Sequence, residues 1–134
     1  MAKVSVSEKI PANAQQVWEM IGNFNSLADW HPAIEKSELE EGGSVRRLTM
    51  PDGTTIVETL TSEDGKERIY EYVIPDGQLP LSGYKAFIRV VEDDDGNCTA
   101  TWESEFEPQA PNAEDMVTGL YQAGFDNLRK MFGG

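Results

Sequence analysis

The chain has 134 residues, of which 24 are acidic and 11 basic, so its formal net charge is −13. A chain of this length is expected to form one domain with a buried core. Its charge would repel a phosphate backbone or an anionic membrane surface, which argues against nucleic acid as a partner.

No part of the sequence approaches the roughly 20 consecutive apolar residues needed to cross a bilayer, so no integral membrane segment is predicted. The first residues, MAKVSVSEKI, alternate polar and apolar side chains and lack the apolar core of a signal peptide. The only cysteine, Cys98, cannot form an internal disulfide. Together these features predict a soluble, cytoplasmic protein.

The first predicted element is a strand within residues 1–10. Asn13 and Gln16 have the spacing of a capping box and predict that a helix starts there. A second, short helix is expected over residues 27–30, because Pro32 prevents its continuation.

From residue 34 to residue 106 the apolar residues recur with a period of two, which is typical of antiparallel strands. Turn signals rich in Gly, Pro, Asp and Asn interrupt this pattern at residues 41–43, 51–53, 64–65, 75–77 and 95–97. The pattern therefore predicts a meander of about six strands, or about seven with the first strand.

The last predicted element is a helix of about five turns that begins near Asn112, a possible N-cap. Its apolar stripe consists of Val117, Leu120, Tyr121, Gly124, Leu128, Met131 and Phe132. Because this stripe and one face of the sheet must bury each other, the sequence predicts an α+β fold: a strand, two short helices, a meander and a long helix.

Several segments, in this order, resemble the polyketide cyclase/dehydrase and lipid-transport superfamily. They are VWEMIGNF, the WHP tripeptide, VRRLTMPDG with IVETL, IYEYVI, YKAFIRV, TATWESEF and AGFDNL. The resemblance implies one START-like (SRPBCC) domain over residues 1–134 with the helix-grip fold, in which a strongly curved antiparallel sheet of about seven strands surrounds the long C-terminal helix. It also implies a deep cavity between helix and sheet. Members of the superfamily include ligand carriers, cyclases, hydrolases and proteins with no assigned activity.

A charged pair is the main candidate for a polar site. If residues 51–53 form a three-residue hairpin loop, Arg46 lies opposite Glu58. A two-residue loop would instead place Arg46 opposite Thr59. In the first register the pair shares its face with the apolar residues Leu48, Met50, Ile56 and Leu60, which would put both charges at the edge of the cavity or inside it.

Two interpretations of this pair are open. In the functional one, Arg46 grips a carboxylate or enolate oxygen of a ligand, while Glu58 orients the ligand or acts as a base with a pKa raised by burial. In the other, the two residues form an ordinary cross-strand ion pair, which contributes about 0.2–1 kcal/mol.

Aromatic residues on the apolar faces are candidates for the cavity lining. They are Trp30, Tyr70, Tyr72, Tyr84, Trp102 and Tyr121. Apolar burial would supply affinity for a ligand, and tyrosine hydroxyls would fix its orientation. The alternative is that these side chains form a normally packed core.

His31, the only histidine, is a candidate for both binding and proton transfer, because an unperturbed imidazole titrates near neutral pH. It could instead cap the preceding helix or hydrogen-bond to its loop. With no second histidine and no spaced cysteines, a metal site is not expected. The sequence also has no Gly-rich phosphate loop, and no cofactor is predicted.

The favoured function is binding of a small hydrophobic or aromatic metabolite or lipid in the internal cavity, by a monomer or homodimer. Residues 25–32 and 77–83 would flank the mouth. The alternative is an enzyme of the polyketide cyclase/dehydratase kind or a small hydrolase, with His31 or Glu58 as base and Arg46 or a tyrosine stabilising an oxyanion. A third possibility is a protein-interaction domain.

Overall fold

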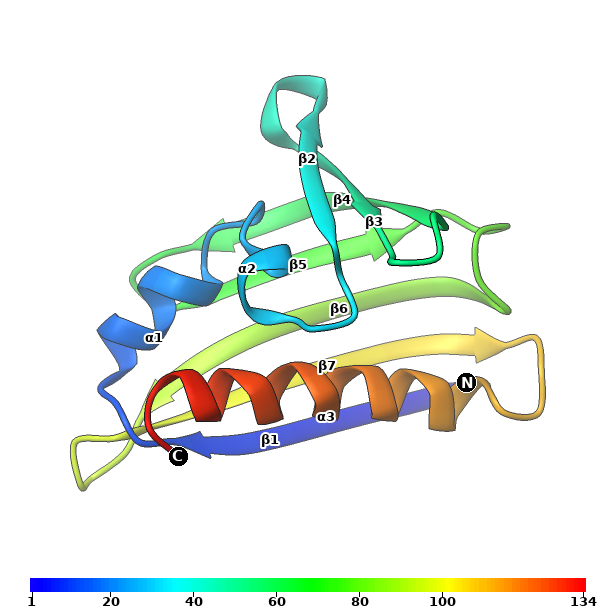
Figure 1. Ribbon diagram of the computed structural model, residues 1–134. Helices are drawn as coiled ribbons and strands as arrows, with labels where there is room; N and C mark the ends of the chain where they lie inside the picture. Colours follow the sequence, from blue (N-terminus) through cyan, green and yellow to red (C-terminus); the bar gives the residue numbers. More distant parts are fainter.

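The structure is a computed structural model that describes residues 1–134. Seven strands form one antiparallel sheet, and the long C-terminal helix packs on it (Figure 1). The elements in chain order are β1 (Ala2–Ile10), α1 (Ala14–Ile21), α2 (Leu27–Trp30), β2 (Lys36–Glu40), the 3-10 turn η1 (Glu41–Gly43), β3 (Val45–Thr49), β4 (Thr55–Asp64), β5 (Ile69–Ile74), β6 (Leu81–Glu92), β7 (Cys98–Pro108) and α3 (Ala113–Met131).

The sheet has the order β1-β7-β6-β5-β4-β3-β2, so the strands after α2 form a meander and β1 pairs with the last of them. Helix α3 lies along β1 and β7 at one end of this order (Figure 1). The α+β fold and the order of elements predicted from the sequence are thereby confirmed. The strong curvature of the sheet stays a prediction. No helix is at once long enough and apolar enough to span a membrane.

The capping box at the start of α1 is present. The Gln16 amide donates to Asn13 Oδ1 at 2.8 Å, and the Asn13 amide donates to Gln16 Oε1 at 3.4 Å. The corresponding prediction for α3 is only half right. Asn112 occupies the N-cap position, but its side chain makes no capping hydrogen bond because its backbone (φ −100°, ψ 10°) is not extended there.

The β3–β4 hairpin adopts the register of the three-residue loop. The Met50 amide donates to Thr54 O at 2.8 Å, and Gly53 has φ 89°, a conformation that glycine adopts without strain. Arg46 therefore lies opposite Glu58. The predicted register is confirmed, and the alternative pairing of Arg46 with Thr59 is wrong.

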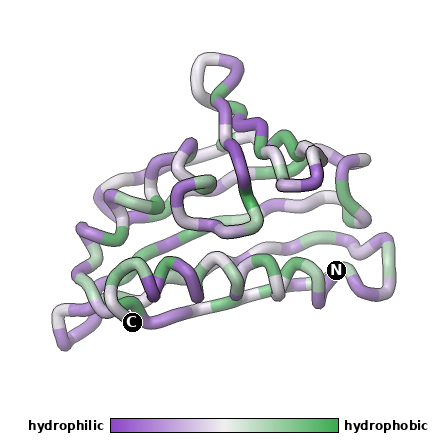
Figure 2. Tube along the Cα trace, viewed as in Figure 1, coloured by the Kyte–Doolittle hydropathy of each residue, from purple (hydrophilic) through white to green (hydrophobic).

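The core lies between the sheet and α3. From α3 it receives Val117, Tyr121, Phe125 and Leu128, all buried. Met131, which the sequence placed in the same stripe, is 43% exposed, because its side chain lies beside Asn127 and outside this row. Figure 2 shows hydrophobic and hydrophilic residues alternating along α3, whereas the edge strand β2 is mostly hydrophilic. Charged residues on an edge strand discourage pairing with another sheet.

Candidate functional site

A cavity of about 690 Å³ lies between α3 and the sheet. Of its 21 lining residues, 15 are hydrophobic. They come from α2 and the segment after it, from strands β3 to β7, and from α3. The lining consists of Leu27, His31, Ala33, Ile34, Leu48, Met50, Pro51, Asp52, Thr54, Ile56, Glu58, Tyr72, Ile74, Leu79, Tyr84, Trp102, Met116, Val117, Gly119, Leu120 and Ala123.

The exposed members of this lining mark the mouth of the cavity. On one side are Met116, Gly119 and Ala123 of α3, and on the other is the β3–β4 hairpin loop, residues 51–54. Residues 25–32, which were expected to flank the mouth together with residues 77–83, contribute Leu27 and His31 to the lining, and both side chains are buried.

The loop before β6 contributes Leu79 to the lining, as expected for residues 77–83. Gln78 fixes this loop to β4. Its Oε1 accepts from the Val57 amide at 2.7 Å, and its Nε2 donates to Val57 O at 2.9 Å. The Gln78 side chain thus makes the hydrogen bonds to the Val57 backbone that a neighbouring strand would make, because β5 ends at Ile74.

Five of the nine candidate site residues line the cavity: His31, Glu58, Tyr72, Tyr84 and Trp102. The other four, Trp30, Arg46, Tyr70 and Tyr121, are buried but do not line it. Each of these four packs behind a residue that does. Tyr121, for example, stacks on Trp102, with ring centroids 4.2 Å apart and planes 12° apart.

Arg46 and Glu58 form a buried ion pair. Arg46 is fully buried and Glu58 is 6% exposed. Arg46 Nε donates to Glu58 Oε1 at 2.8 Å, and Arg46 Nη2 donates to the same oxygen at 2.6 Å. No hydrogen bond from the protein reaches the other carboxylate oxygen, Oε2. Because Glu58 lines the cavity and Arg46 does not, Glu58 is the member of the pair that a ligand would meet.

The remaining donors of Arg46 also point into the protein. Its Nη1 donates to Phe24 O at 2.8 Å and to the Tyr70 hydroxyl at 3.3 Å. Its guanidinium carbon lies 4.2 Å from the centre of the Phe24 ring, a cation–π contact. The interpretation in which Arg46 grips a ligand carboxylate does not fit this geometry, because each of its three nitrogens already donates to a protein group and the fully buried side chain does not line the cavity.

Burial raises the pKa of Glu58 above its usual value, against the opposing effect of the Arg46 charge and hydrogen bonds. Burial also acts against the charge on Arg46, but Tyr70 and Glu58 outweigh it and keep the Arg46 pKa above its usual value. Arg46 therefore stays charged, and Glu58 is the member of the pair whose protonation state can change.

A tyrosine cluster of Tyr72, Tyr84 and Tyr121 forms the second polar feature. The Tyr72 and Tyr84 hydroxyls are 3.0 Å apart, and the Tyr84 hydroxyl also bonds to that of Tyr121. Trp102 Nε1 donates to the Tyr72 hydroxyl at 2.9 Å. Burial raises the pKa of all three phenols, so they remain protonated at neutral pH.

His31 is held by the backbone on both sides of its ring. The Ala33 amide donates to Nδ1 at 3.1 Å, so the proton of the neutral ring is on Nε2, which donates to Leu120 O at 2.7 Å. Burial lowers the His31 pKa, although the bond to Leu120 opposes this effect. Both ring nitrogens thus form hydrogen bonds with the backbone. This geometry fits a His31 that hydrogen-bonds to its loop better than a His31 that transfers protons.

Most of the α3 residues that line the cavity are not among the site residues predicted from the sequence. Met116, Leu120 and Ala123 follow helical spacing and form a row beside the core row of Val117 and Tyr121. This helical spacing is the feature of the sequence from which these lining residues could have been predicted. No group of three or more His, Cys, Asp or Glu side chains is arranged to hold a metal ion.

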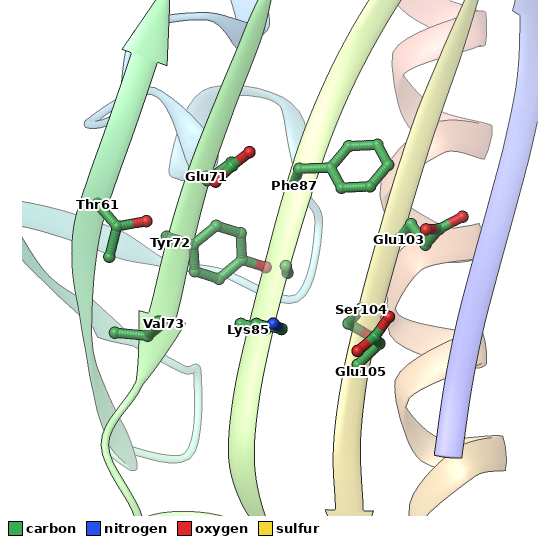
Figure 3. A pocket seen from close by; sticks show the side chains of 10 residues that line it. Thr61, Glu71, Tyr72, Val73, Lys85, Phe87, Glu103, Ser104 and Glu105 are labelled. Carbon is green, nitrogen blue, oxygen red and sulfur yellow. The ribbon is translucent and has the colours of Figure 1, made fainter. Parts of the chain in front are cut away.

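A second, smaller depression of about 240 Å³ lies on the sheet face that points away from α3 (Figure 3). There Glu71, Phe87 and Glu103 form a row across β5, β6 and β7, and Lys85 lies in the next row beside Glu105 (Figure 3). This depression is lined by few hydrophobic residues, and we regard the cavity beneath α3 as the candidate site.

Comparison with known proteins finds a family described as polyketide cyclase/dehydrase and lipid transport, whose match extends over residues 1–133. A search of the curated proteins finds no match.

Solved structures with the same architecture include two from Bacillus. The protein XoxI from Bacillus cereus is 39% identical, with a TM-score of 0.95 over 98% of this chain and 96% of that one. A putative uncharacterized protein from Bacillus thuringiensis is 40% identical, with a TM-score of 0.93 over 98% of both chains. The Zhui aromatase/cyclase from Streptomyces sp. R1128 is 20% identical, with a TM-score of 0.74 over 96% of this chain and 89% of that one, and shares the fold.

Proposed function

This chain belongs to the polyketide cyclase/dehydrase and lipid transport family, and from that premise we propose that it binds a small, largely apolar molecule in the cavity beneath α3. The observation that carries the proposal is the cavity itself. Its volume of about 690 Å³ lies within the range of about 300–1,000 Å³ that is usual for ligand pockets. Its lining is mostly apolar and has a few polar groups, which is the composition such pockets use for affinity and orientation.

Binding is favoured over catalysis because two of the groups that an enzyme would need are already engaged. Both nitrogens of His31 bond to backbone groups, and the donors of Arg46 point away from the cavity. Glu58, with its raised pKa, is the one observation in favour of an enzyme of the polyketide cyclase kind. A general base removes a proton from the substrate, and a second group must then stabilise the negative charge left there. Arg46 does not line the cavity and so is not placed to do this.

The proposal is tested by closing the mouth. Gly119 lies at the mouth on α3, and a Cβ there would meet nothing within 4 Å. In a Gly119→Phe variant the phenyl ring can fill the mouth without clashing with the core. The matched control is Thr118→Phe, which adds an aromatic ring at the neighbouring exposed position outside the lining.

Binding of 2-naphthol, followed by isothermal titration calorimetry, is expected for the unmodified protein and for Thr118→Phe, with at least a tenfold loss of affinity in Gly119→Phe. No saturable binding to the unmodified protein, or equal affinity in both variants, would contradict the proposal. Native mass spectrometry of the protein purified from its own cells would then identify a retained small molecule.

A further inference from the structure

One carboxylate oxygen in the cavity wall has no hydrogen-bond partner. Glu58 is 6% exposed, and its Oε1 receives both hydrogen bonds from Arg46, while Oε2 receives none. Oε2 is not among the polar atoms that are sealed from solvent without a partner, so water in the cavity can reach it. A ligand that fills the cavity displaces this water, and a charged acceptor left without a donor is costly. A ligand that brings its own donor to Oε2 avoids this cost.

The two oxygens of Glu58 cannot exchange roles freely. Arg46 is held by Phe24 O, by the Tyr70 hydroxyl and by the ring of Phe24, so its donors stay where they are. Of the two terminal side-chain atoms of residue 58, the one that faces Arg46 must therefore be a hydrogen-bond acceptor. The second terminal atom then faces the cavity.

The tyrosine cluster complements this acceptor. It contains three hydroxyl protons but only two hydroxyl-to-hydroxyl hydrogen bonds, those of Tyr84 with Tyr72 and with Tyr121. Since Trp102 donates to Tyr72 and cannot accept, these two bonds leave one of the three hydroxyl protons for another acceptor.

The spare proton has two directions. On Tyr72 or Tyr84 it points to the cavity, which both residues line. On Tyr121 the nearest alternative acceptor is Ser104, whose buried Oγ makes no hydrogen bond. Rotation of the hydroxyls thus lets the cluster donate to a ligand oxygen when one is present.

We propose that the cavity selects an apolar molecule that carries a hydroxyl group, which donates to Glu58 Oε2 while an oxygen of the same molecule accepts from Tyr72 or Tyr84. This inference rests on the proposed binding function. A carboxylate ligand is disfavoured, since it would face Glu58 while Arg46 is turned away. A pure hydrocarbon is disfavoured, since it would leave Oε2 dry and without a donor.

The test uses a pair of probes with the same rings and the same oxygen, of which only one has a hydrogen-bond donor. 2-Naphthol has a hydroxyl group, and 2-methoxynaphthalene has the same rings with the proton replaced by methyl. We expect 2-naphthol to bind at least tenfold more tightly in a chemical-shift titration. Equal affinity for the two probes would overturn the inference but not the binding function, whereas binding of neither would overturn both.

A substitution sharpens the test. In Glu58→Gln the amide oxygen must face Arg46, so the NH₂ group takes the place of Oε2 and turns the acceptor into a donor. The preference for 2-naphthol should then disappear or reverse, while Glu71→Gln, an equal change of charge on the other face of the sheet, should keep it. Retention of the preference in Glu58→Gln would overturn the inference.

If Glu58→Gln does not fold, a double variant Arg46→Met/Glu58→Met removes both charges of the pair. It should bind the two probes with similar affinity. A double variant that still prefers 2-naphthol by tenfold would equally overturn the inference.

Discussion

Gly124 of α3 lies against the ring of His31 so closely that a Cβ on Gly124 would be 2.6 Å from His31 Cδ2. The same Cβ would be 3.0 Å from Cζ3 of Trp30. One turn earlier in α3, the Leu120 carbonyl accepts the hydrogen bond from His31. The absence of a side chain at Gly124 therefore allows α2 and α3 to meet, and this contact forms one wall of the cavity.

Two glycine substitutions in α3 should have opposite effects. Gly124→Ala should lower the free energy of unfolding by about 1–3 kcal/mol, because the added methyl group overpacks the contact with His31 and Trp30. Gly119→Ala should raise it by about 0.5–1 kcal/mol, because that position is open and alanine favours a helix more than glycine does. Urea unfolding measures both, and equal effects would contradict the packing described here.

His31 should titrate below the usual histidine pKa of about 6.5, because burial disfavours its charged form. As the only histidine, it gives a single, unambiguous Hε1 resonance in a proton NMR titration. A midpoint at or above about 6.5 would contradict the buried, doubly bonded neutral ring.

The same shift makes stability depend on pH. Between about 6.5 and the lower pKa of the folded state, the unfolded chain binds a proton at His31 that the folded chain does not. The free energy of unfolding should therefore fall as the pH is lowered through this window. A His31→Gln variant, although less stable, should lose this part of the pH dependence.

Arg46→Met should destabilise the protein by about 3–5 kcal/mol at pH 7, because it leaves the Glu58 carboxylate buried without its partner. Without Arg46 the pKa of Glu58 rises further, so the folded state holds a proton that the unfolded chain has lost. The destabilisation should thus shrink as the pH falls toward about 4.3, where the carboxyl group of the unfolded chain also becomes protonated.

Arg47→Met is the control for this prediction. The adjacent Arg47 pairs with Glu40 at the surface, with side chains 41% and 39% exposed, and such pairs contribute at most about 1 kcal/mol. Equal, pH-independent effects of the two substitutions in urea unfolding would show that Arg46 and Glu58 do not behave as a buried pair.

Tyr84→Phe should cost more stability than Tyr70→Phe. The Tyr84 hydroxyl is the middle of its cluster and bonds to both Tyr72 and Tyr121, so its removal leaves two buried hydroxyls with fewer partners. We expect a loss of about 1–3 kcal/mol. Tyr70 accepts one longer bond from Arg46 at 3.3 Å, and its removal should cost less than about 1 kcal/mol. Thermal or urea unfolding of the two variants gives the comparison.

The register that creates the polar site could be predicted from the sequence because it depends on local turn chemistry. Pro51, Asp52 and Gly53 suit a three-residue loop, and that loop alone fixes Arg46 opposite Glu58. The capping box of α1 is local in the same sense, since its two partners are three residues apart.

The sequence could not predict which site residues line the cavity and which pack behind them. Period-two alternation gives the sheet face on which a side chain lies, but lining and packing residues share that face. Tyr70 and Tyr72 have the same phase in β5, yet only Tyr72 lines the cavity, because Tyr70 packs against Phe24 and Arg46. The position of Arg46 away from the cavity likewise depends on its hydrogen bond to Phe24 O, a backbone group 22 residues away in the sequence.

The central claim, that a small apolar molecule binds beneath α3, is tested most directly by locating a bound probe. In a sample with labelled methyl groups, intermolecular NOEs from 2-naphthol are expected to the methyl groups of Leu48, Ile56, Ile74 and Leu120, which line the cavity. NOEs confined to Val73, which lines the depression on the opposite face of the sheet, or to the exposed Leu39 and Val91, would contradict the claim.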